Sequence, residues 1–352
     1  MSTDVLLSIR ELTKYFPMPK KKVFDRERPY LKANERISLD IKKGETFGLV
    51  GESGCGKSTF GRTVLQLYKP TSGSVLYYGR NGKEGAPEDA IDLTRLHVKE
   101  LRSLRKDLQI VFQDPYSSLD PRMTVGQIIE EGVATHRYFK KGTKEMREYV
   151  HKVLSDCGLR EDMIHRYPHQ FSGGQRQRIS IARALAVKPK FVVCDECVSA
   201  LDVSVQSQIL NLLSDLKEKE ELTYLFISHD LSVVRHISDR IGVMYLGQIV
   251  EQGGAEEVFN NPRHPYTVAL LSAIPKISSN RGEKSEKIIL QGNMPSPVNP
   301  PKGCPFHTRC FMAQECCQRI PAPLVEVGKG HFAACHFAEK TAEEKCAIAR
   351  RK

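Results

Sequence analysis

The fold is decided by the stretch Gly51-Glu52-Ser53-Gly54-Cys55-Gly56-Lys57-Ser58, which matches the G-x-x-x-x-G-K-S pattern of a phosphate-binding loop. Residues 46–50 before it are typical of a buried strand, and residues 59–67 after it have the periodicity of an amphipathic helix. In such a unit the glycines let backbone N–H groups converge on phosphates. The pattern therefore predicts a nucleotide site in which Lys57 reaches the terminal phosphates and the Ser58 hydroxyl coordinates Mg²⁺.

Composition favours a globular protein with more than one domain. The 352 residues exceed an average domain, and 40% hydrophobic with 27% charged residues are ordinary values for a chain with a substantial core. We expect neither a signal peptide nor a membrane span, because no apolar run approaches the roughly 18 residues that a span needs. A net charge of +11 attracts nucleic acid or anionic lipid when it is concentrated on one surface. Here both signs are interspersed and no aromatic series accompanies them, so we expect a solvated surface and no specific nucleic-acid partner.

Short apolar runs alternate with helical periodicity up to about residue 260, which predicts an α/β fold around a largely parallel sheet. Residues 108–112, 191–194 and 224–227 are continuous apolar runs, as expected for strands covered on both faces. Each run leads into polar residues at the end where α/β sheets bind ligands. These polar residues are Gln113, Asp195 and His229.

Three other regions differ from this alternation. Residues 5–9 and 36–41 are typical of strands, and the charged segment 17–34 between them predicts an exposed loop. Helical periodicity, as in residues 125–133 and 144–157, predicts a helical subdomain over residues 114 to about 185. Further along, four prolines predict a linker into a cysteine-rich tail: Pro295, Pro297, Pro300 and Pro301.

Two more segments fit phosphate and magnesium chemistry. The strand at residues 191–194 delivers two carboxylates to its end, of which Asp195 would hold magnesium and Glu196 would polarise an attacking water. Residues 171–175 precede an arginine-rich helix, and a serine with glycines at a helix N-terminus presents N–H groups and the positive dipole end to an anion. An ordinary helix cap is the alternative for that segment.

Together these motifs resemble the ATP-binding cassette of ABC transporters over residues 5–260. The resemblance implies a P-loop NTPase fold with a mixed, largely parallel sheet and a helical subdomain, followed by a small cysteine-rich extension at residues 261–352. Residues 51–58 resemble Walker A, Gln113 the Q-loop glutamine, Asp195 and Glu196 the Walker B aspartate and the catalytic glutamate, and His229 the switch histidine. Asp202 lies in a segment similar to the D-loop, and Ser172, Gly173, Gly174 and Gln175 resemble the signature motif.

The resemblance also implies which residues bind ATP and magnesium. Phe16 stands where the family stacks an aromatic ring on adenine, with Tyr15 as the alternative. Catalysis would use Glu196, His229, Lys57 and Gln113. Mg²⁺ would be held by Ser58, Gln113 and Asp195. The ATP-binding set is Phe16, Gly51, Ser53, Gly54, Cys55, Gly56, Lys57, Ser58, Thr59, Gln113, Ser172, Gly173, Gly174, Gln175, Asp195 and Asp202.

Longer phrases are similar to the oligopeptide/dipeptide importer subfamily, namely residues 51–59, 112–122, 198–204 and 264–267. This similarity implies the second of two ATPase subunit types, paired with a non-identical homologous subunit at the cytoplasmic face of the cell membrane. The other partners would be two transmembrane permease subunits, docked on residues 114–127, and an extracytoplasmic peptide-binding protein. Two residues depart from the family pattern: Phe171 stands where leucine is common, and Cys197 replaces the proline that usually follows the catalytic glutamate.

The implied function is ATP hydrolysis that drives the import of oligopeptides or dipeptides. In the family, each ATP lies between Walker A of one subunit and the signature of another, and the catalytic glutamate orients or deprotonates the attacking water. One alternative is the same role for another solute, such as nickel or a glycopeptide. Alternatives of a different class are a soluble cassette protein that acts on ribosomes or DNA, and a regulator that senses metal or redox state through the tail.

The tail carries most of the ten cysteines. Without an export signal we expect a reducing compartment, where clustered thiols hold metal more often than they form disulfides. Four cysteines with turn-forming residues between them suit an iron–sulfur cluster or tetrahedral zinc. These are Cys304, Cys310, Cys317 and Cys335.

Residues 303–310 resemble the C-terminal region of oligopeptide ATPases, some of which carry a 4Fe-4S cluster, and this resemblance favours iron. Cys316, which is adjacent to Cys317, could replace it as the fourth ligand. The alternative to a metal centre is that these cysteines are free structural thiols. Histidines that could contribute to a zinc site are His307, His331 and His336. Isolated cysteines, expected to be buried or loop residues, are Cys55, Cys157, Cys194 and Cys197.

Overall fold

The structure is a computed structural model that describes residues 5–20, 28–79, 90–274 and 287–350. The chain divides into two compact units, which are described in turn. The first unit consists of Met1–Ser8, Asp40–Thr46 and Val75–Ile227, and the second of Ile9–Leu39, Phe47–Ser74 and Ser228–Lys352. No helix within the described ranges combines the length and hydropathy that a transmembrane span requires.

Three parallel strands form the sheet of the first unit, in the order β8-β7-β6. They are β6 (Leu108–Val111), β7 (Phe191–Asp195) and β8 (Thr223–Ser228). Every residue of β7 and β8 is buried, which explains why these runs are apolar without alternation. The strands predicted from the three runs are therefore confirmed.

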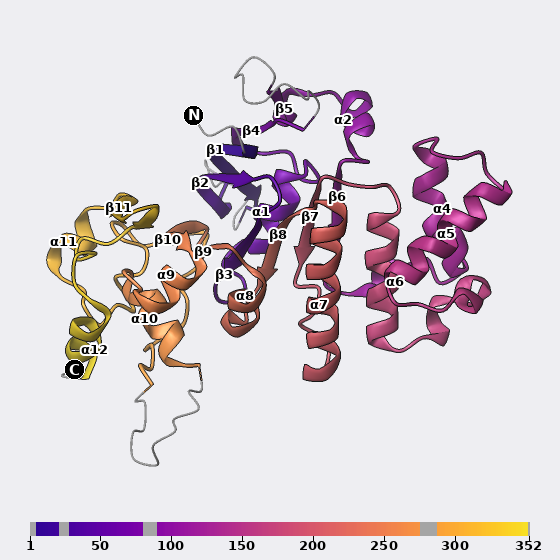
Figure 1. Cartoon of the computed structure of the whole chain (residues 1–352). Coiled ribbons are helices and arrows are strands. Elements are labelled where there is room, and N and C mark those ends of the chain that lie inside the picture. The colour runs from indigo at the N-terminus through magenta and orange to yellow at the C-terminus, as the bar shows by residue number, and fades with distance from the viewer. Residues whose placement is uncertain (1–4, 21–27, 80–89, 275–286, 351–352) are drawn as a thin grey trace, which may run out of the picture. The chain divides into compact units, whose positions relative to one another are not determined.

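Helices make up most of the rest of the first unit. The predicted helices at residues 125–133 and 144–157 are confirmed as α4 (Val125–Thr135) and α5 (Lys144–Asp156). Both pack against α6 (Gly173–Leu185), as Figure 1 shows. The extent of the helical subdomain stays a prediction. The remaining helical elements are η2 (Leu93–Arg95), α2 (Val98–Leu104), α3 (Pro115–Ser118), η3 (Glu161–His165), η4 (Pro168–Gln170) and α7 (Val203–Glu220).

The sheet of the second unit is mixed, with the strand order β11-β12-β10-β9-β3. Its strands are β3 (Thr46–Val50), β9 (Arg240–Tyr245), β10 (Gln248–Gly254), β11 (Val325–Gly328) and β12 (His331–Ala333). β3 runs parallel to β9, and the other pairs are antiparallel. The C-terminal segment is not a separate extension, because β12 pairs with β10, with Ala333 opposite Glu251.

Aromatic side chains pack the C-terminal segment onto the hairpin of β9 and β10. The ring centroids of Tyr245 and Tyr266 lie 4.8 Å apart, and Phe306 lies 5.2 and 5.4 Å from them. All three rings are buried, which gives this unit a core of its own. Helices of the second unit are α1 (Lys57–Val64), α8 (Leu231–Ile237), α9 (Ala255–Asn260), α10 (Pro265–Ser272), α11 (Glu315–Arg319) and α12 (Ala342–Arg350).

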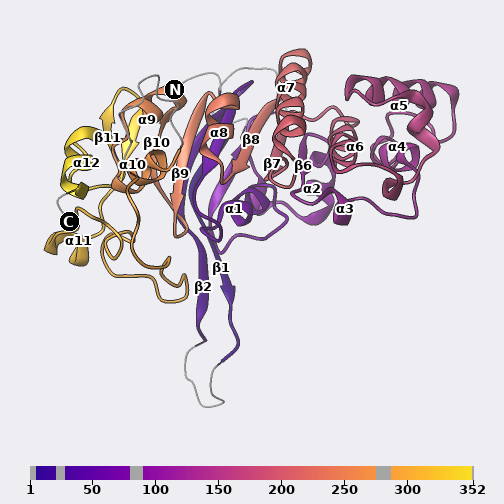
Figure 2. The same cartoon turned by 90° about the horizontal axis from the view of Figure 1, so that it is seen from below.

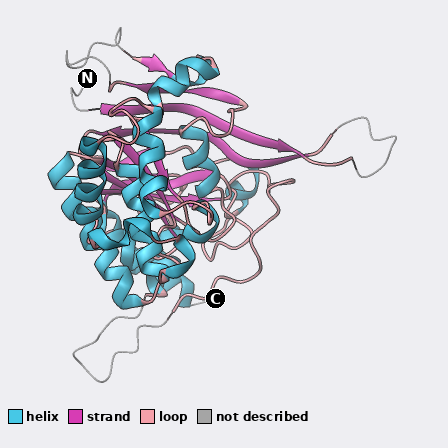
Figure 3. Cartoon of the chain, turned by 90° about the vertical axis from the view of Figure 1, so that its right-hand side faces the viewer, coloured by secondary structure: helices cyan, strands magenta, loops and turns pink. Residues whose placement is uncertain are grey.

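A second sheet has the strand order β2-β1-β4-β5, and its long strands lie side by side in Figure 2. Its strands are β1 (Val5–Pro17), β2 (Tyr30–Lys42), β4 (Ser72–Tyr77) and β5 (Ile91–Asp92). In Figure 3 the described strands are magenta and the described helices are cyan.

The strands predicted at residues 5–9 and 36–41 are confirmed, but both are longer. Residues 30–34 belong to β2 rather than to the predicted loop 17–34, and residues 21–27 lie outside the described residues. Exposed positions alternate with buried ones near the middle of β2, and strands with a solvated face tolerate charged residues.

Candidate functional site

The predicted phosphate loop connects β3 to α1 in the second unit. Gly56 is the N-cap of α1 with φ 108°, a conformation that favours glycine. A Cβ on Gly56 would lie 2.2 Å from the carbonyl oxygen of Ala33, and one on Gly51 would lie 2.2 Å from that of Met244. The glycines at both ends of the loop are thus required by close passage of other backbone.

Lys57 lies inside the curve of this loop. Its Nζ donates hydrogen bonds to the carbonyl oxygens of Gly51, at 2.7 Å, and Glu52, at 3.0 Å. The side chain is only 4% exposed. Ser53 and Gly54 are exposed at the tip of the loop, and the neighbouring predicted ligands Cys55, Ser58 and Thr59 are buried or half-buried. The loop therefore has the lysine inside and an accessible rim.

Phe16, the predicted adenine platform, is half-buried near the end of β1. Its ring meets Tyr68 edge-on at 5.4 Å between centroids, and Lys14 Nζ lies 4.7 Å from the ring centroid. Tyr15, the alternative, is hydrogen-bonded through its hydroxyl to Glu35. Burial, together with this bond, raises the pKa of Tyr15 to about 12. The hydroxyl group of Tyr15 is therefore already engaged by Glu35, whereas the half-buried Phe16 ring has no polar group to satisfy.

In the first unit, the structure brings together Gln113 and Glu196, which follow neighbouring strands. Val111 of β6 lies opposite Cys194 of β7, so both chains leave the sheet at the same level. Gln113 Nε2 donates a hydrogen bond of 2.9 Å to Glu196 Oε2. Asp195 is fully buried at the end of β7. Amide and carboxylate groups thus gather at the carboxyl edge of the strands, where α/β sheets bind ligands.

The predicted signature residues form the N-terminus of α6. Ser172 is the N-cap: its Oγ accepts from Gln175 N–H at 3.4 Å, and Gln175 Oε1 accepts from Ser172 N–H at 3.1 Å. The helix-cap interpretation is therefore correct as a description of these contacts. Ser172 and Gly173 are nevertheless exposed. A Cβ on Gly174 would lie 2.4 Å from Val205 Cγ1, which explains this glycine by packing against α7.

Asp202 and His229 complete the predicted set. Asp202 caps α7 and accepts from Ser204 Oγ at 2.6 Å and Val205 N–H at 2.9 Å. These bonds lower the pKa of Asp202. His229 is exposed directly after β8. Lys57 and His229 belong to the second unit, and Asp195, Glu196 and the signature residues to the first.

Known protein families match both the segment with the nucleotide motifs and the C-terminal part of the chain. The family model described as ABC transporter matches residues 34–199, and the model described as Oligopeptide/dipeptide transporter, C-terminal region, matches residues 250–317. The Oligopeptide transport ATP-binding protein AppF of Bacillus subtilis (strain 168) is 50% identical over 335 residues, which cover 95% of this chain and 98% of AppF. The chain belongs to the oligopeptide/dipeptide family of ABC transporter ATP-binding proteins.

Further comparisons agree with this family. The Dipeptide transport ATP-binding protein DppF of Haemophilus influenzae is 48% identical over 330 residues, covering 94% of this chain and 96% of DppF. The dimeric structure of the cassette MJ0796 bound to ADP and Pi has a TM-score of 0.59 at 30% identity and covers 71% of this chain and 99% of that one. The cassette MJ1267 in its ADP conformation has a TM-score of 0.60 at 27% identity, with 77% and 99% covered. The predicted ABC cassette fold is confirmed.

The four tail cysteines predicted as ligands line one small cavity of the second unit. Burial raises the pKa of Cys310 to about 12 and that of Cys335 to about 11, and it also raises those of Cys304 and Cys317. Among the described residues, however, no group of three or more His, Cys, Asp or Glu side chains is placed to hold a metal ion. The positions of these side chains therefore do not support the metal centre that was predicted for the tail.

The additional ligands considered for the tail have other partners. Cys316 Sγ lies 4.0 Å from Cys317 Sγ. His307 Nδ1 is 2.8 Å from the carbonyl oxygen of Cys304, and His336 Nε2 is 3.0 Å from that of Ile320. The third histidine, His331, is buried, and its Nε2 lies 2.8 Å from Glu251 Oε1.

The cysteines outside the tail are buried, as predicted: Cys55, Cys157, Cys194 and Cys197. The side chains of Cys194 and Cys197 contact each other on either side of Asp195 and Glu196 in the sequence. A hydrogen bond with Cys197 and complete burial raise the pKa of Cys194 well above its ordinary value. Glu196 has φ 49°, so the chain turns sharply between the two thiols.

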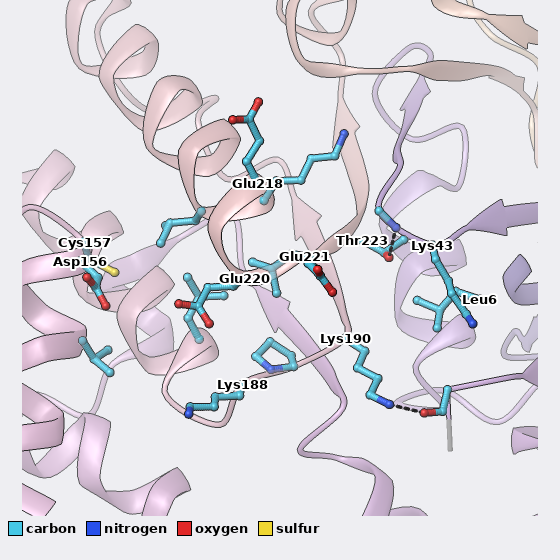
Figure 4. Close-up of a pocket in the computed structure, with 18 of the residues that line it drawn as sticks. Leu6, Lys43, Asp156, Cys157, Lys188, Lys190, Glu218, Glu220, Glu221 and Thr223 are labelled. Carbon is cyan, nitrogen blue, oxygen red and sulfur yellow. Dashed lines mark hydrogen bonds between the residues drawn. The ribbon is translucent and has the colours of Figure 1, made fainter. Parts of the chain in front are cut away.

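A large cavity of the first unit does not contain the predicted site. It has a volume of about 760 Å³ and lies at the opposite, amino end of the strands, next to Lys190 and Thr223 (Figure 4). Its rim carries both signs of charge, as in Lys43, Lys188 and Glu220. Nothing in its lining matches a motif found in the sequence.

One residue of the phosphate loop received no role from the sequence. Glu52 forms an ion pair with Arg309, 2.9 Å from nitrogen to oxygen, and its backbone N–H donates to Tyr266 Oη at 2.9 Å. Arg309 and Glu52 are 257 residues apart. A separation of this size leaves no local pattern from which the contact could have been predicted.

Proposed function

We propose that this chain is the ATP-hydrolysing subunit that energises the import of oligopeptides or dipeptides through a membrane ABC transporter. The observation that carries the proposal is its 50% identity to AppF over 95% of the chain, a similarity that spans the cassette and the C-terminal region. ATP hydrolysis follows from the cassette. Nickel, glycopeptide, ribosome or DNA functions are not favoured, because the relatives are named for oligopeptide, dipeptide or peptide transport.

In the proposed reaction the protein positions ATP and stabilises charge. Lys57 neutralises charge on the terminal phosphates, and His229 contacts the terminal phosphate. Glu196 orients or deprotonates the attacking water. The hydrogen bond from Gln113 to Glu196 supports this assignment, because it fixes the direction of the carboxylate. Phe16 supplies the platform for the adenine ring.

Magnesium is the expected companion of ATP. The predicted ligand groups are the Ser58 hydroxyl, the Gln113 amide oxygen and the Asp195 carboxylate, and hard oxygen donors of this kind fit Mg²⁺. Asp195 is completely buried, and a buried carboxylate is favoured by a nearby cation. When bound, the ion would offset charge on the phosphates.

The proposed partners follow from the same function. They are a second, homologous ATPase subunit, two transmembrane permease subunits and an extracytoplasmic peptide-binding protein, with this chain at the cytoplasmic face of the membrane. The exposed N-terminus of α6 supports an ATP contact from a neighbouring subunit. Tyr116 in the proposed docking segment 114–127 is 63% exposed and lies over Arg176, which gives the permease an aromatic surface. No specific nucleic acid is proposed.

Peptide uptake by cells tests the proposed function. Cells in which this chain is the sole ATPase subunit of its type are given a labelled oligopeptide, a labelled dipeptide or nickel. We expect loss of peptide uptake when the chain is deleted, and recovery when the wild-type chain is returned. Normal peptide uptake without the chain, or loss of nickel uptake alone, would contradict the proposal. Proteins that co-purify with the tagged chain identify its partners.

A metal centre in the tail is a second proposal. The four thiols line one cavity, but as the described side chains lie they do not form a group placed to hold an ion. Thiols bind metals as thiolates, so binding of a metal would release protons. Iron, sulfide and zinc analysis after anaerobic purification distinguishes a 4Fe-4S cluster, zinc and free thiols. If iron, sulfide and zinc were all absent, the result would favour free thiols.

A further inference from the structure

Glu52 is held by all three of its polar groups. Its backbone N–H donates to Tyr266 Oη at 2.9 Å, and its carbonyl oxygen accepts from Lys57 Nζ at 3.0 Å. Its carboxylate oxygens lie 3.1 and 2.9 Å from Arg309 Nη1. One residue of the phosphate loop therefore links the phosphate-binding lysine to two side chains from the C-terminal part of the protein.

The Arg309–Glu52 ion pair is sheltered from water. The side chain of Arg309 is 9% exposed and that of Glu52 is 28% exposed. The guanidinium group lies 5.9 Å from the centroid of the Tyr245 ring. Ion pairs in such positions are screened less than surface pairs, and loss of one partner leaves the other charge uncompensated.

Both anchoring side chains come from the region that matches the oligopeptide/dipeptide C-terminal model, residues 250–317. Tyr266 lies in α10, and Arg309 lies between two of the tail cysteines. The buried Tyr245 links the two anchors, because its ring centroid lies 4.8 Å from that of Tyr266 and 5.9 Å from the Arg309 guanidinium group. Both anchors of Glu52 therefore lie in the C-terminal region, outside the segment that matches the ABC transporter model.

We propose that Arg309 is a positioning residue for the phosphate loop, through which the C-terminal region sets the affinity for nucleoside triphosphate. An unpaired Glu52 carboxylate in this loop would repel a bound triphosphate, and Arg309 offsets that charge. The same pair fixes the Glu52 backbone, whose carbonyl oxygen holds Lys57. The inference rests on the proposed ATP-binding function of the loop.

The test is equilibrium titration of the purified full-length chain with a fluorescent ATP analogue and Mg²⁺. Arg309→Ala should raise the dissociation constant roughly tenfold or more, because a sheltered, charge-assisted contact is lost. In a Glu52→Ala background, Arg309→Ala should change it by less than about twofold, since its partner is already gone. Arg309→Lys, which keeps the charge, should lie between wild type and Arg309→Ala.

Arg319→Ala is the matched control, because Arg319, just after the matched residues 250–317, forms an exposed ion pair with Glu315. It should leave the dissociation constant unchanged. Wild-type affinity in Arg309→Ala, or an equal loss in both backgrounds, would overturn the positioning role. Should Arg309→Ala fail to fold, as judged by circular dichroism, wild-type affinity in both Glu52→Ala and Arg309→Lys would overturn it instead. No Mg²⁺-dependent binding by the folded wild type would refute the proposed nucleotide function itself, a separate outcome.

Discussion

Gln113 Nε2 and Glu196 Oε2 are joined by a hydrogen bond of 2.9 Å between residues that are 83 positions apart. The register of β6 and β7 produces this contact, because Val111 and Cys194 lie opposite each other just before the strands end. Residues 114–127, the predicted docking surface, begin directly after Gln113. Movement of that segment would therefore reach the proposed catalytic carboxylate through a single side chain.

Gln113→Ala removes this bond and should lower kcat for ATP hydrolysis by the assembled transporter roughly tenfold, since a hydrogen bond to a charged group is lost. KM for ATP should change less. The exposed Gln208 on α7 provides the control, and Gln208→Ala should behave as wild type. An unchanged kcat in Gln113→Ala would show that the contact does not matter for turnover.

Ser172 allows the helix-cap and signature interpretations to be separated. Ser172→Asp retains an N-cap acceptor but adds a negative charge where the signature would meet phosphate. We expect wild-type-like thermal stability and strongly reduced hydrolysis by the assembled transporter. Ser172→Ala should lower the free energy of unfolding by about 1 kcal/mol through loss of the cap. Full activity in Ser172→Asp would favour a purely structural serine.

Gly174→Ala tests the packing of α6 against α7. The new Cβ would lie 2.4 Å from Val205 Cγ1, and overpacking of this kind costs about 1–3 kcal/mol. Gly173→Ala in the same helix is the control, because a Cβ there would lie at an ordinary contact distance of 3.6 Å from Leu201 Cδ2, and its effect should stay within about 0.5 kcal/mol. Urea denaturation measures both; equal stability of the two variants would contradict the packing argument.

The sequence predicted the strands around the candidate site because their environment leaves a strong pattern. Residues 191–195 are buried on both faces, so that four apolar residues in succession precede Asp195. The helices α4 and α5 were predictable for a similar reason, since each has a buried stripe with the helical period. The long ends of β1 and β2 were missed because charged residues interrupt their apolar runs, as Arg10 and Glu11 do in β1 and as Lys32 and Glu35 do in β2.

Contacts between distant residues could not be predicted in this way. Glu52 and Arg309 each look like an ordinary charged residue in their own segment, and only the fold brings them together. Cys194 and Cys197 were close in sequence, but their contact depends on the left-handed conformation of Glu196. Residues other than glycine rarely adopt that backbone conformation, and the spacing of the two cysteines does not predict it.

The most direct measurement of the central claim is ATP hydrolysis by the assembled transporter that contains Glu196→Gln, with Glu145→Gln, an exposed residue of α5, as the control. We predict that Glu196→Gln binds Mg²⁺-ATP as wild type does but turns over at least about 100-fold more slowly, because the amide cannot accept the proton of water. Hydrolysis at the wild-type rate by Glu196→Gln would contradict the account.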